Sequence, residues 1–237
     1  MSKLNIQLKE QFIIEDLEEQ GAMYSYLNPA SIGNLISSGG NKITYYIDGG
    51  LLAMLLTILL GRRIQRVSFD YTSIADLVFK KLSEDSKSVY LFGASQLEVD
   101  AFASKLKNVY PNLAVVGYSN GYVKKESWGE VTSAILELNV DFTLVGLGAG
   151  LQEEFLEQLK ESGYSGVGYS CGGFIRQESN SLAIGYYPKL INSLKLRWLY
   201  RMYKEPHTIA RYLIDYPRNM LRVTVLFLFR KLNFSIR

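Results

Sequence analysis

The sequence has few of the residues that most metal and redox sites require. Of its 237 residues, one is a cysteine, Cys171, and one is a histidine, His207. A single cysteine excludes a disulfide within the chain, and a zinc site would have to combine both residues with scattered carboxylates. We therefore expect no disulfide framework, no metal centre and no other cofactor.

Long apolar runs are also missing. The longest, residues 51–60 (LLAMLLTILL), has ten residues, whereas a membrane-spanning helix needs about 20. Its all-round hydrophobicity favours a buried core helix over one that receives a lipid chain. The first residues lack the apolar segment of a signal peptide. These absences predict a cytoplasmic protein that lies on a membrane surface at most.

Acidic residues are scarce in the last fifth of the chain. Residues 187–237 carry 11 lysines and arginines against Glu205 and Asp215, which gives +9, and the rest, with 15 basic and 21 acidic residues, is at −6. Such a basic segment suits a polyanion, either anionic lipid or nucleic acid. No nucleic-acid-binding motif accompanies it, so we favour a lipid surface. A basic helix that is docked on the domain and solvated on one side is the alternative.

Helix and strand patterns alternate between residues 30 and 170. Strands are predicted at 43–47, 88–93, 113–118, 141–148 and 166–170, and helices at 30–37, 51–60, 72–84, 95–109, 124–138 and 150–162. Repeated strand–helix units with short connections predict an α/β fold with a doubly wound, mainly parallel sheet. Beyond Tyr187 the pattern is helical only. We therefore expect a domain of residues 1–187 and a basic, amphipathic helical appendage of residues 188–237.

Ligands in such sheets bind beyond the carboxyl ends of the strands. Asp48 directly follows a predicted strand, where a carboxylate can act as a general base. The alternative is an N-cap of helix 51–60, and from the residues alone the cap is favoured.

Two glycine loops follow later strands. In GLGAG (146–150), Gly146 and Gly148 would let backbone N–H groups approach a phosphate at a helix N-terminus. Gln152 and Glu153, in the first turn of that helix, either bind a ribose or base or complement the helix dipole. In the second loop, Cys171 is better explained as a buried, inert thiol than as a nucleophile, because no histidine lies near it in sequence.

Six segments, taken in order, resemble the WecG/TagA/CpsF family, glycosyltransferase family 26. They are YLNPASI (26–32), YYIDGG (45–50), RRIQRVSFDYTSIADLVF (62–79), YPNLAVVGYSNGYV (110–123), VGLGAGLQEEF (145–155) and LRWLYRMYKEPHTIARY (196–212). Each segment is modest alone, but six in the family's order are fairly specific, and they span most of the chain.

The resemblance implies a Rossmann-like domain with a C-terminal helical appendage that docks on the membrane. Family members transfer a sugar from a UDP-sugar to a saccharide on undecaprenyl diphosphate, invert the anomeric centre and are regarded as metal-independent. An Asp-x-Asp motif, with which many sugar-nucleotide enzymes hold a divalent metal, is absent from this sequence. The partners expected are a UDP-sugar, a lipid-linked saccharide acceptor and the anionic inner face of the cytoplasmic membrane, with no nucleic acid.

The resemblance also assigns roles to residues. It favours Asp48 as the general base over the helix cap, and it places Arg66 near the site. We expect the donor at a set of loop residues: Asn28, Gly146, Gly148, Gln152, Glu153 and Gly172. Three arginines, Arg197, Arg201 and Arg211, fall in the appendage, where arginines are thought to reach the diphosphate; plain lipid contact is the alternative.

This sequence departs from the family's pattern at several positions. Tyr26 stands where the family has threonine, Gly150 replaces a proline, and the loop before Phe174 lacks an aspartate. Arg197 stands where many members have glutamate. These departures leave the sugar, the acceptor and the polymer (capsule or exopolysaccharide among others) open. They also keep a non-catalytic, UDP-sugar-binding regulatory or assembly protein as the alternative. The oligomeric state is open too, a homo-oligomer included.

Overall fold

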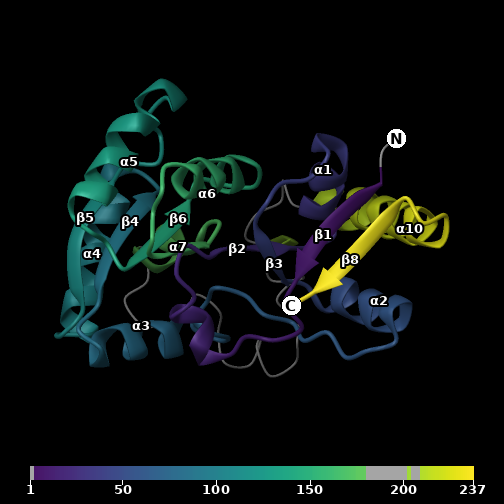
Figure 1. Cartoon of the computed structure of the whole chain (residues 1–237), viewed down its shortest axis with the longest axis horizontal. Helices are drawn as coiled ribbons and strands as arrows, with labels where there is room; N and C mark the ends of the chain where they lie inside the picture. The colour runs from purple at the N-terminus through teal and green to yellow at the C-terminus, as the bar shows by residue number, and fades with distance from the viewer. Residues whose placement is uncertain (1–2, 180–201, 204–208) are drawn as a thin grey trace.

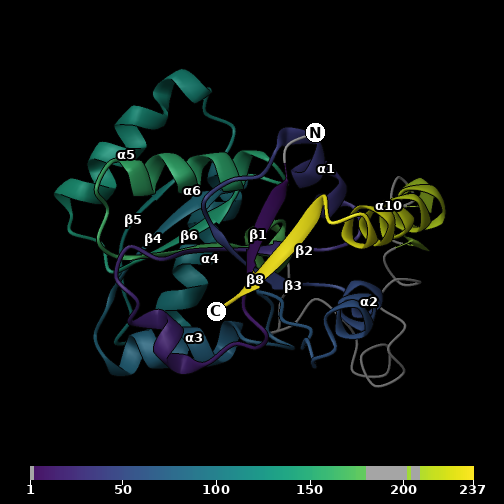
Figure 2. The ribbon, with the colours of Figure 1, turned by 45° about the vertical axis from the view of Figure 1, so that its right-hand side comes forward.

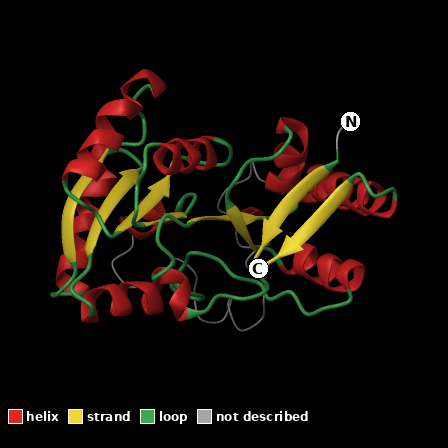
Figure 3. Cartoon of the chain, viewed as in Figure 1, coloured by secondary structure: helices red, strands yellow, loops and turns green. Residues whose placement is uncertain are grey.

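The computed structural model describes residues 3–179, 202–203 and 209–237. These residues form an eight-stranded sheet in the order β5-β4-β6-β7-β2-β3-β1-β8, and each neighbouring pair is parallel (Figures 1 and 3). The strands are β1 (Leu4–Leu8), β2 (Met23–Leu27), β3 (Thr44–Ile47), β4 (Ser88–Gly93), β5 (Ala114–Ser119), β6 (Phe142–Gly146), β7 (Val167–Ser170) and β8 (Leu232–Ile236). The predicted α/β fold with a doubly wound parallel sheet is confirmed.

Helices cover both faces of this sheet, and each face has its own hydrophobic core. One core lies under α1 (Ser31–Ser38), α2 (Gly50–Leu60), α5 (Trp128–Glu137), α6 (Leu151–Glu161) and α10 (Tyr216–Leu228). The other lies under α3 (Ala75–Glu84), α4 (Gln96–Val109) and α7 (Phe174–Ser179). Figures 1 and 2 show α6 and α3 on opposite sides of the strands. Side chains along a strand point alternately to the two faces of the sheet. Because both faces are covered here, the side chains of β2 and β3 are buried throughout.

Local sequence signals fix several of these elements. Before α4, the hydroxyl of Ser95 accepts a hydrogen bond from the N–H of Glu98, and the Glu98 carboxylate accepts one from the N–H of Ser95 at 2.8 Å. This reciprocal capping starts the helix after only two intervening residues, 94 and 95. Gly39 and Gly61, both with positive φ, end α1 and α2. Elements between residues 30 and 170 therefore lie close to their predicted ranges.

The expectation of helices alone beyond residue 187 is wrong at the C-terminal end. Residues 232–236 form β8, which pairs in parallel with β1 from Leu4↔Leu232 to Leu8↔Ile236. Figure 1 shows the two strands side by side at one edge of the sheet. In β8, buried Leu232 and Phe234 alternate with the more exposed Asn233 and Ser235, as period-two pairing requires. The pattern is only five residues long and follows an apolar helix, so it is easily read as the end of that helix.

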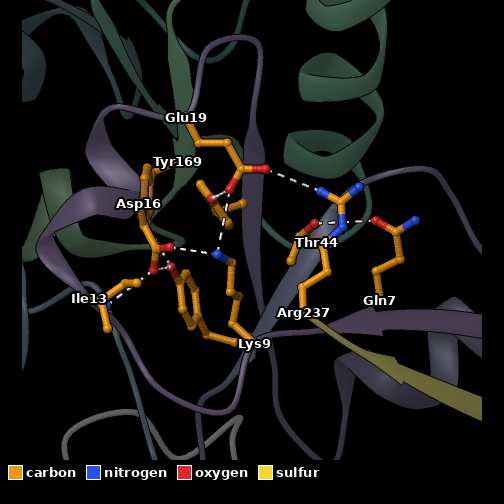
Figure 4. A network of polar contacts seen from close by, with 10 residues as sticks. Gln7, Lys9, Ile13, Asp16, Glu19, Thr44, Tyr169 and Arg237 are labelled. Atoms are coloured by element: carbon orange, nitrogen blue, oxygen red, sulfur yellow. Dashed lines mark hydrogen bonds and ion pairs between the residues drawn. The ribbon is translucent and has the colours of Figure 1, made fainter.

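A polar network holds the N-terminal segment against the sheet (Figure 4). The Lys9 ammonium is 2.6 Å from Oδ1 of Asp16, whose side chain is 1% exposed. The other Asp16 oxygen accepts hydrogen bonds from the Tyr46 hydroxyl at 2.5 Å and from the backbone N–H of Ile13 at 3.2 Å. Nearby, the Tyr24 hydroxyl donates to Glu19 and holds the pKa of that carboxyl below its ordinary value. Asp16 is thus a buried charge that depends on its partners.

The expectation that the apolar helix 51–60 lies wholly in the core is wrong on one of its faces. Leu52, Ala53 and Leu56 of α2 are buried, whereas Leu51, Met54 and Ile58 are 56%, 59% and 71% exposed. Among the described residues, no helix has both the length and the apolarity that crossing a bilayer would demand.

Candidate active site

Asp48 lies directly after β3, where the carboxyl ends of the parallel strands meet. Its backbone N–H donates to the Leu27 carbonyl at 2.7 Å, which keeps it against the end of β2. On the other side of β3, the N–H of Val67 donates to the Ile47 carbonyl at 2.8 Å, and residues 47 and 66 form a parallel bridge. The segment after α2 therefore continues the sheet beyond the end of β1 and delivers Arg66 next to Asp48.

The Arg66 guanidinium connects two carboxylates. Its Nη2 is 3.1 Å from Oδ1 of Asp48 and 3.6 Å from Oδ2 of Asp70, and it donates to the Ser68 hydroxyl at 2.8 Å. The side chains of Asp48 and Arg66 are 33% and 34% exposed, so a ligand can reach both. The structure thus brings together the two residues that we predicted as catalytic.

The carboxylates of Asp48 and Asp70 differ in the hydrogen bonds that their oxygens accept. Oδ1 of Asp70 accepts from the N–H and the hydroxyl of Thr72, and Oδ2 accepts from the Ser68 hydroxyl at 2.7 Å. Oδ2 of Asp48, by contrast, has no hydrogen-bond donor among the described residues. Asp48 does not cap α2, whose N-cap is Gly49 and has no side-chain bond. Asp48 is therefore the carboxylate with an oxygen left to accept a proton.

Asn28 follows β2 at the same edge. Its Oδ1 accepts from the backbone N–H groups of Ala30 and Ser31 at 2.9 and 3.0 Å, so the side chain closes the turn into α1. A Cβ placed on Gly49, which has φ +136°, would lie 3.3 Å from the Pro29 ring. The loops after β2 and β3 are therefore packed together, and direct contact of Asn28 with a donor stays a prediction.

The glycine loops after β6 and β7 also meet. A Cβ on Gly146 would be 2.9 Å from the Gly172 carbonyl oxygen, so only glycine allows this approach. The N–H of Gly172 donates to Oε1 of Gln152 at 3.1 Å, which joins the second loop to the start of α6. Gly148, with φ +86°, has open space where its Cβ would be. The predicted donor-binding glycines thus share one edge of the sheet with Asp48.

Gln152 and Glu153 are buried between these loops, 6% and 8% exposed. Oε1 of Glu153 accepts from the Ser25 hydroxyl at 2.6 Å and from the Gln152 amide at 2.9 Å, and Oε2 accepts from the Gly150 N–H at 2.6 Å. The carboxylate therefore occupies the N-terminus of its own helix, as the helix-dipole alternative requires. Both side chains hold the loops in place, and their contact with a nucleotide stays a prediction.

Sequence reasoning missed several residues that build this edge. Ser68 and Asp70 orient Arg66, and Ser25 and Ser170, whose hydroxyls are 2.7 Å apart, join β2 to β7 beneath Glu153. The hydroxyl of Tyr26 is buried and has no hydrogen-bond partner among the described residues, and burial holds the pKa of this phenol well above its ordinary value. In the sequence, only the alternation of side chains along β2 could have indicated that positions 24 and 26 lie on the same buried face of the strand.

Cys171 is buried, as predicted, and burial raises the pKa of its thiol to about 12. Burial disfavours the charged thiolate, so a raised pKa leaves the thiol neutral throughout the physiological range. At pH 8 we expect roughly 10³-fold less thiolate than in a free cysteine of pKa about 8.5. Iodoacetamide should therefore modify the native protein very slowly and the urea-unfolded protein completely, as mass spectrometry would show. Rapid modification of the native protein would contradict the buried, inert thiol.

The predicted appendage arginines are described only in part. Arg197 and Arg201 lie outside the described residues, as does His207. Arg211 begins the π-helical turn η4 (Arg211–Asp215) that leads into α10, and its guanidinium is 5.7 Å from the centre of the Tyr212 ring. Within the described part of the chain, no hydrogen bond or ion pair joins Arg211 to Asp48 or Arg66.

Potential metal ligands do not gather in the part of the chain that the structure describes. Over residues 3–179, 202–203 and 209–237, no group of three or more His, Cys, Asp and Glu side chains is placed to hold an ion.

Comparison with known proteins identifies a family and several relatives. Residues 41–233 match the family described as "Glycosyl transferase WecG/TagA/CpsF family". A "UDP-Gal:alpha-D-GlcNAc-diphosphoundecaprenol beta-1,4-galactosyltransferase" of Shigella boydii is 32% identical over 187 residues, which are 77% of this chain and 78% of that protein. An "N-acetylglucosaminyldiphosphoundecaprenol N-acetyl-beta-D-mannosaminyltransferase" of Bacillus subtilis is 27% identical over 212 residues, 86% of this chain and 79% of that protein.

Proposed function

This chain belongs to the glycosyl transferase WecG/TagA/CpsF family, and from that premise we propose that it transfers a sugar from a UDP-sugar to a saccharide on undecaprenyl diphosphate. Both relatives are named for acceptors of this lipid-linked kind. The observation that carries the proposal is the Asp48–Arg66 pair, whose side chains are one-third exposed and in which Oδ2 of Asp48 has no hydrogen-bond donor among the described residues. We place the reaction in the synthesis of a cell-surface polysaccharide such as capsule or exopolysaccharide.

The proposed reaction is a single in-line displacement with inversion. Oδ2 of Asp48 accepts the proton of an acceptor-sugar hydroxyl while that oxygen attacks the anomeric carbon of the donor. The bond from the anomeric carbon to the UDP oxygen breaks, and its electron pair leaves with UDP. Arg66 acts as a positioning residue, because its contact with Oδ1 turns Oδ2 toward the acceptor.

The leaving diphosphate needs positive or hydrogen-bonding partners, and we propose that no metal is required. A Cβ on Gly148 would meet open space, so the loop backbone at Gly148 can approach a phosphate, beside the start of α6 where Glu153 already accepts from the Gly150 N–H. We assign further contacts to Arg197, Arg201 and Arg211 of the appendage on the strength of the sequence resemblance. Asn28, Gly146 and Gly172 would then line the donor site through their backbone.

We also propose that the protein works on the inner face of the cytoplasmic membrane without crossing it. Three exposed apolar side chains of α2, Leu51, Met54 and Ile58, support this proposal, as do others on α10. Helices α2 and α10 are in contact and lie on the same side of the sheet. Apolar side chains beside basic ones are typical of helices that lie in a membrane interface, where each lysine or arginine contributes about 1 kcal/mol.

Transfer can be tested with a panel of labelled UDP-sugars and undecaprenyl-diphosphate-linked GlcNAc as acceptor, in the presence of EDTA. We expect one donor to give a lipid-linked product at full rate with the chelator, because the proposed reaction uses no divalent ion. The control is the same lipid carrying no sugar. A donor that binds but never transfers, to this or longer lipid-linked saccharides, would refute the enzyme and support the non-catalytic UDP-sugar-binding protein.

A further inference from the structure

A second polar feature lies between α1 and α10. The two helices are in contact, and a cavity of about 390 Å³ opens between them, lined by Gly33, Asn34, Ser37, Arg218, Asn219 and Arg222. This volume falls within the range of small-molecule sites, about 300–1,000 Å³. We propose that this cavity binds a phosphate group, carried either by an anionic lipid or by a soluble phosphate ester.

The cavity is built on two closely packed helices. A Cβ on Gly33 would lie 2.4 Å from the side-chain nitrogen of Asn219, so a larger residue could not hold this spacing. Asn219 is 5% exposed, and its amide donates to the Pro29 carbonyl at 2.9 Å, which anchors α10 to the turn before α1. The walls are therefore held by backbone packing and a buried hydrogen bond, as a preorganised site requires.

The charge of the cavity selects an anion. Arg218 and Arg222 are four residues apart on one side of α10, where like charges repel each other and an anion between them is favoured. Arg218 is paired with Asp215 at 2.8 Å, but Asp215 is not among the lining residues. Arg222 donates to the Ser37 hydroxyl at 2.9 Å and to the Gly33 carbonyl, and its charge has no carboxylate partner among the described residues.

A phosphate matches the hydrogen-bonding groups that remain. The hydrogen bonds that Arg222 makes within the described chain all come from Nη1, so its Nε and Nη2 can form the two parallel bonds that phosphate oxygens accept. The Asn34 amide adds a neutral donor on the α1 side, whereas the Ser37 hydroxyl already donates to the Gly33 carbonyl at 2.9 Å and helps to fix Arg222.

The surroundings of the cavity favour a phosphate that is presented by a lipid. Leu221, Val225 and Leu228 form an exposed apolar stripe on α10, 66%, 41% and 68% exposed, at helical spacing beside the two arginines. Acyl chains could cover this stripe while the phosphate enters the cavity. A soluble phosphate ester would contact the arginines but not the apolar stripe. Binding measurements with soluble phosphates and with lipid vesicles therefore distinguish the two sources.

The test uses the full chain and needs no transfer activity. Binding of inorganic phosphate and of glycerol 3-phosphate is measured by calorimetry. Binding to phosphatidylcholine vesicles, with and without phosphatidylglycerol, is measured by co-sedimentation. The variants are Arg222→Gln, which removes the unpaired charge, and Asn34→Leu, which fills the cavity mouth and keeps every charge. Lys107→Gln, an exposed lysine of α4 on the opposite face of the sheet, is the charge-matched control.

We expect Arg222→Gln and Asn34→Leu each to weaken binding about tenfold, and Lys107→Gln to bind like the wild type. Saturable binding of either soluble phosphate identifies a free-phosphate site, whereas binding only to phosphatidylglycerol vesicles identifies a lipid headgroup. The proposal is overturned if nothing binds, or if Asn34→Leu binds like the wild type, because the effect would then be charge alone. The lipid source rests on the proposed membrane location, but neither result bears on glycosyl transfer, so this site and the transfer activity fail independently.

Discussion

Replacing Asp48 by asparagine is expected to lower kcat about 10²- to 10⁴-fold while the donor still binds. The substitution keeps the shape of the side chain and an oxygen that can accept from Arg66, which is 3.1 Å from Oδ1 in the wild type. It removes the basic site at Oδ2, and general-base catalysis typically contributes a factor of this size. Initial rates of lipid-linked product formation give kcat, and calorimetry with the UDP-sugar gives donor affinity.

Two further variants make the result specific. Asp85→Asn removes a carboxylate that pairs with Lys81 at the C-terminal end of α3. This position precedes the amino end of β4, so the substitution should leave kcat unchanged. Asp70→Asn alters the second carboxylate near Arg66 and should lower kcat less than Asp48→Asn, because both Asp70 oxygens already serve the loop. If Asp70→Asn were the more damaging of the two, the base would have to be reassigned.

Replacing Asp16 by alanine is expected to lower the free energy of unfolding by about 3–5 kcal/mol. The Asp16 carboxylate is 1% exposed and accepts from Lys9, Tyr46 and the backbone of Ile13. Its loss leaves the Lys9 ammonium, 14% exposed, with Glu19 at 3.5 Å as its one carboxylate partner in the described part of the chain, and leaves a buried tyrosine hydroxyl without its main acceptor. Urea unfolding followed by circular dichroism measures the change.

The matched control is Asp85→Ala, which breaks an ion pair of similar length at the surface. Lys81 and Asp85 are 30% and 34% exposed and 3.0 Å apart, and such pairs contribute about 0–1 kcal/mol. If Asp16→Ala fails to fold, Asp16→Asn, which keeps one acceptor, should unfold at an intermediate urea concentration. Equal losses for Asp16→Ala and Asp85→Ala would show that burial adds nothing to the Asp16 network.

Regular alternation made the middle of the fold predictable from sequence. The strands from β3 to β7 and the helices between them have long apolar periods and clear stops at glycine, so their ranges were recovered. β1, β2 and β8 were missed, because β1 and β8 have only five residues each, with β8 at the edge of the sheet, and β2 carries three polar-tipped residues among five buried positions. Their pairing is decided by register with strands distant in sequence, which periodicity does not contain.

The candidate site, too, could be predicted from sequence only in part. Asp48 could be placed because it follows a strand, and the family resemblance pointed to Arg66, but neither signal shows that they touch. Their contact depends on the bridge between residues 47 and 66, which forms only after the chain has crossed α2 and returned to β3. The serines that fix the geometry, Ser25, Ser68 and Ser170, are individually unremarkable in sequence. Their roles arise from tertiary contacts alone.

The pairing of β8 with β1 anchors the described C-terminal part of the basic segment to the sheet. A free chain end can detach from a surface one residue at a time, but α10 leads into β8, which pairs with β1 along its whole length. This pairing already limits the freedom of α10, so ordering the helix against a surface costs less entropy than ordering a free end. A force that pulls α10 away from the domain would therefore strain the hydrogen bonds that pair β8 with β1.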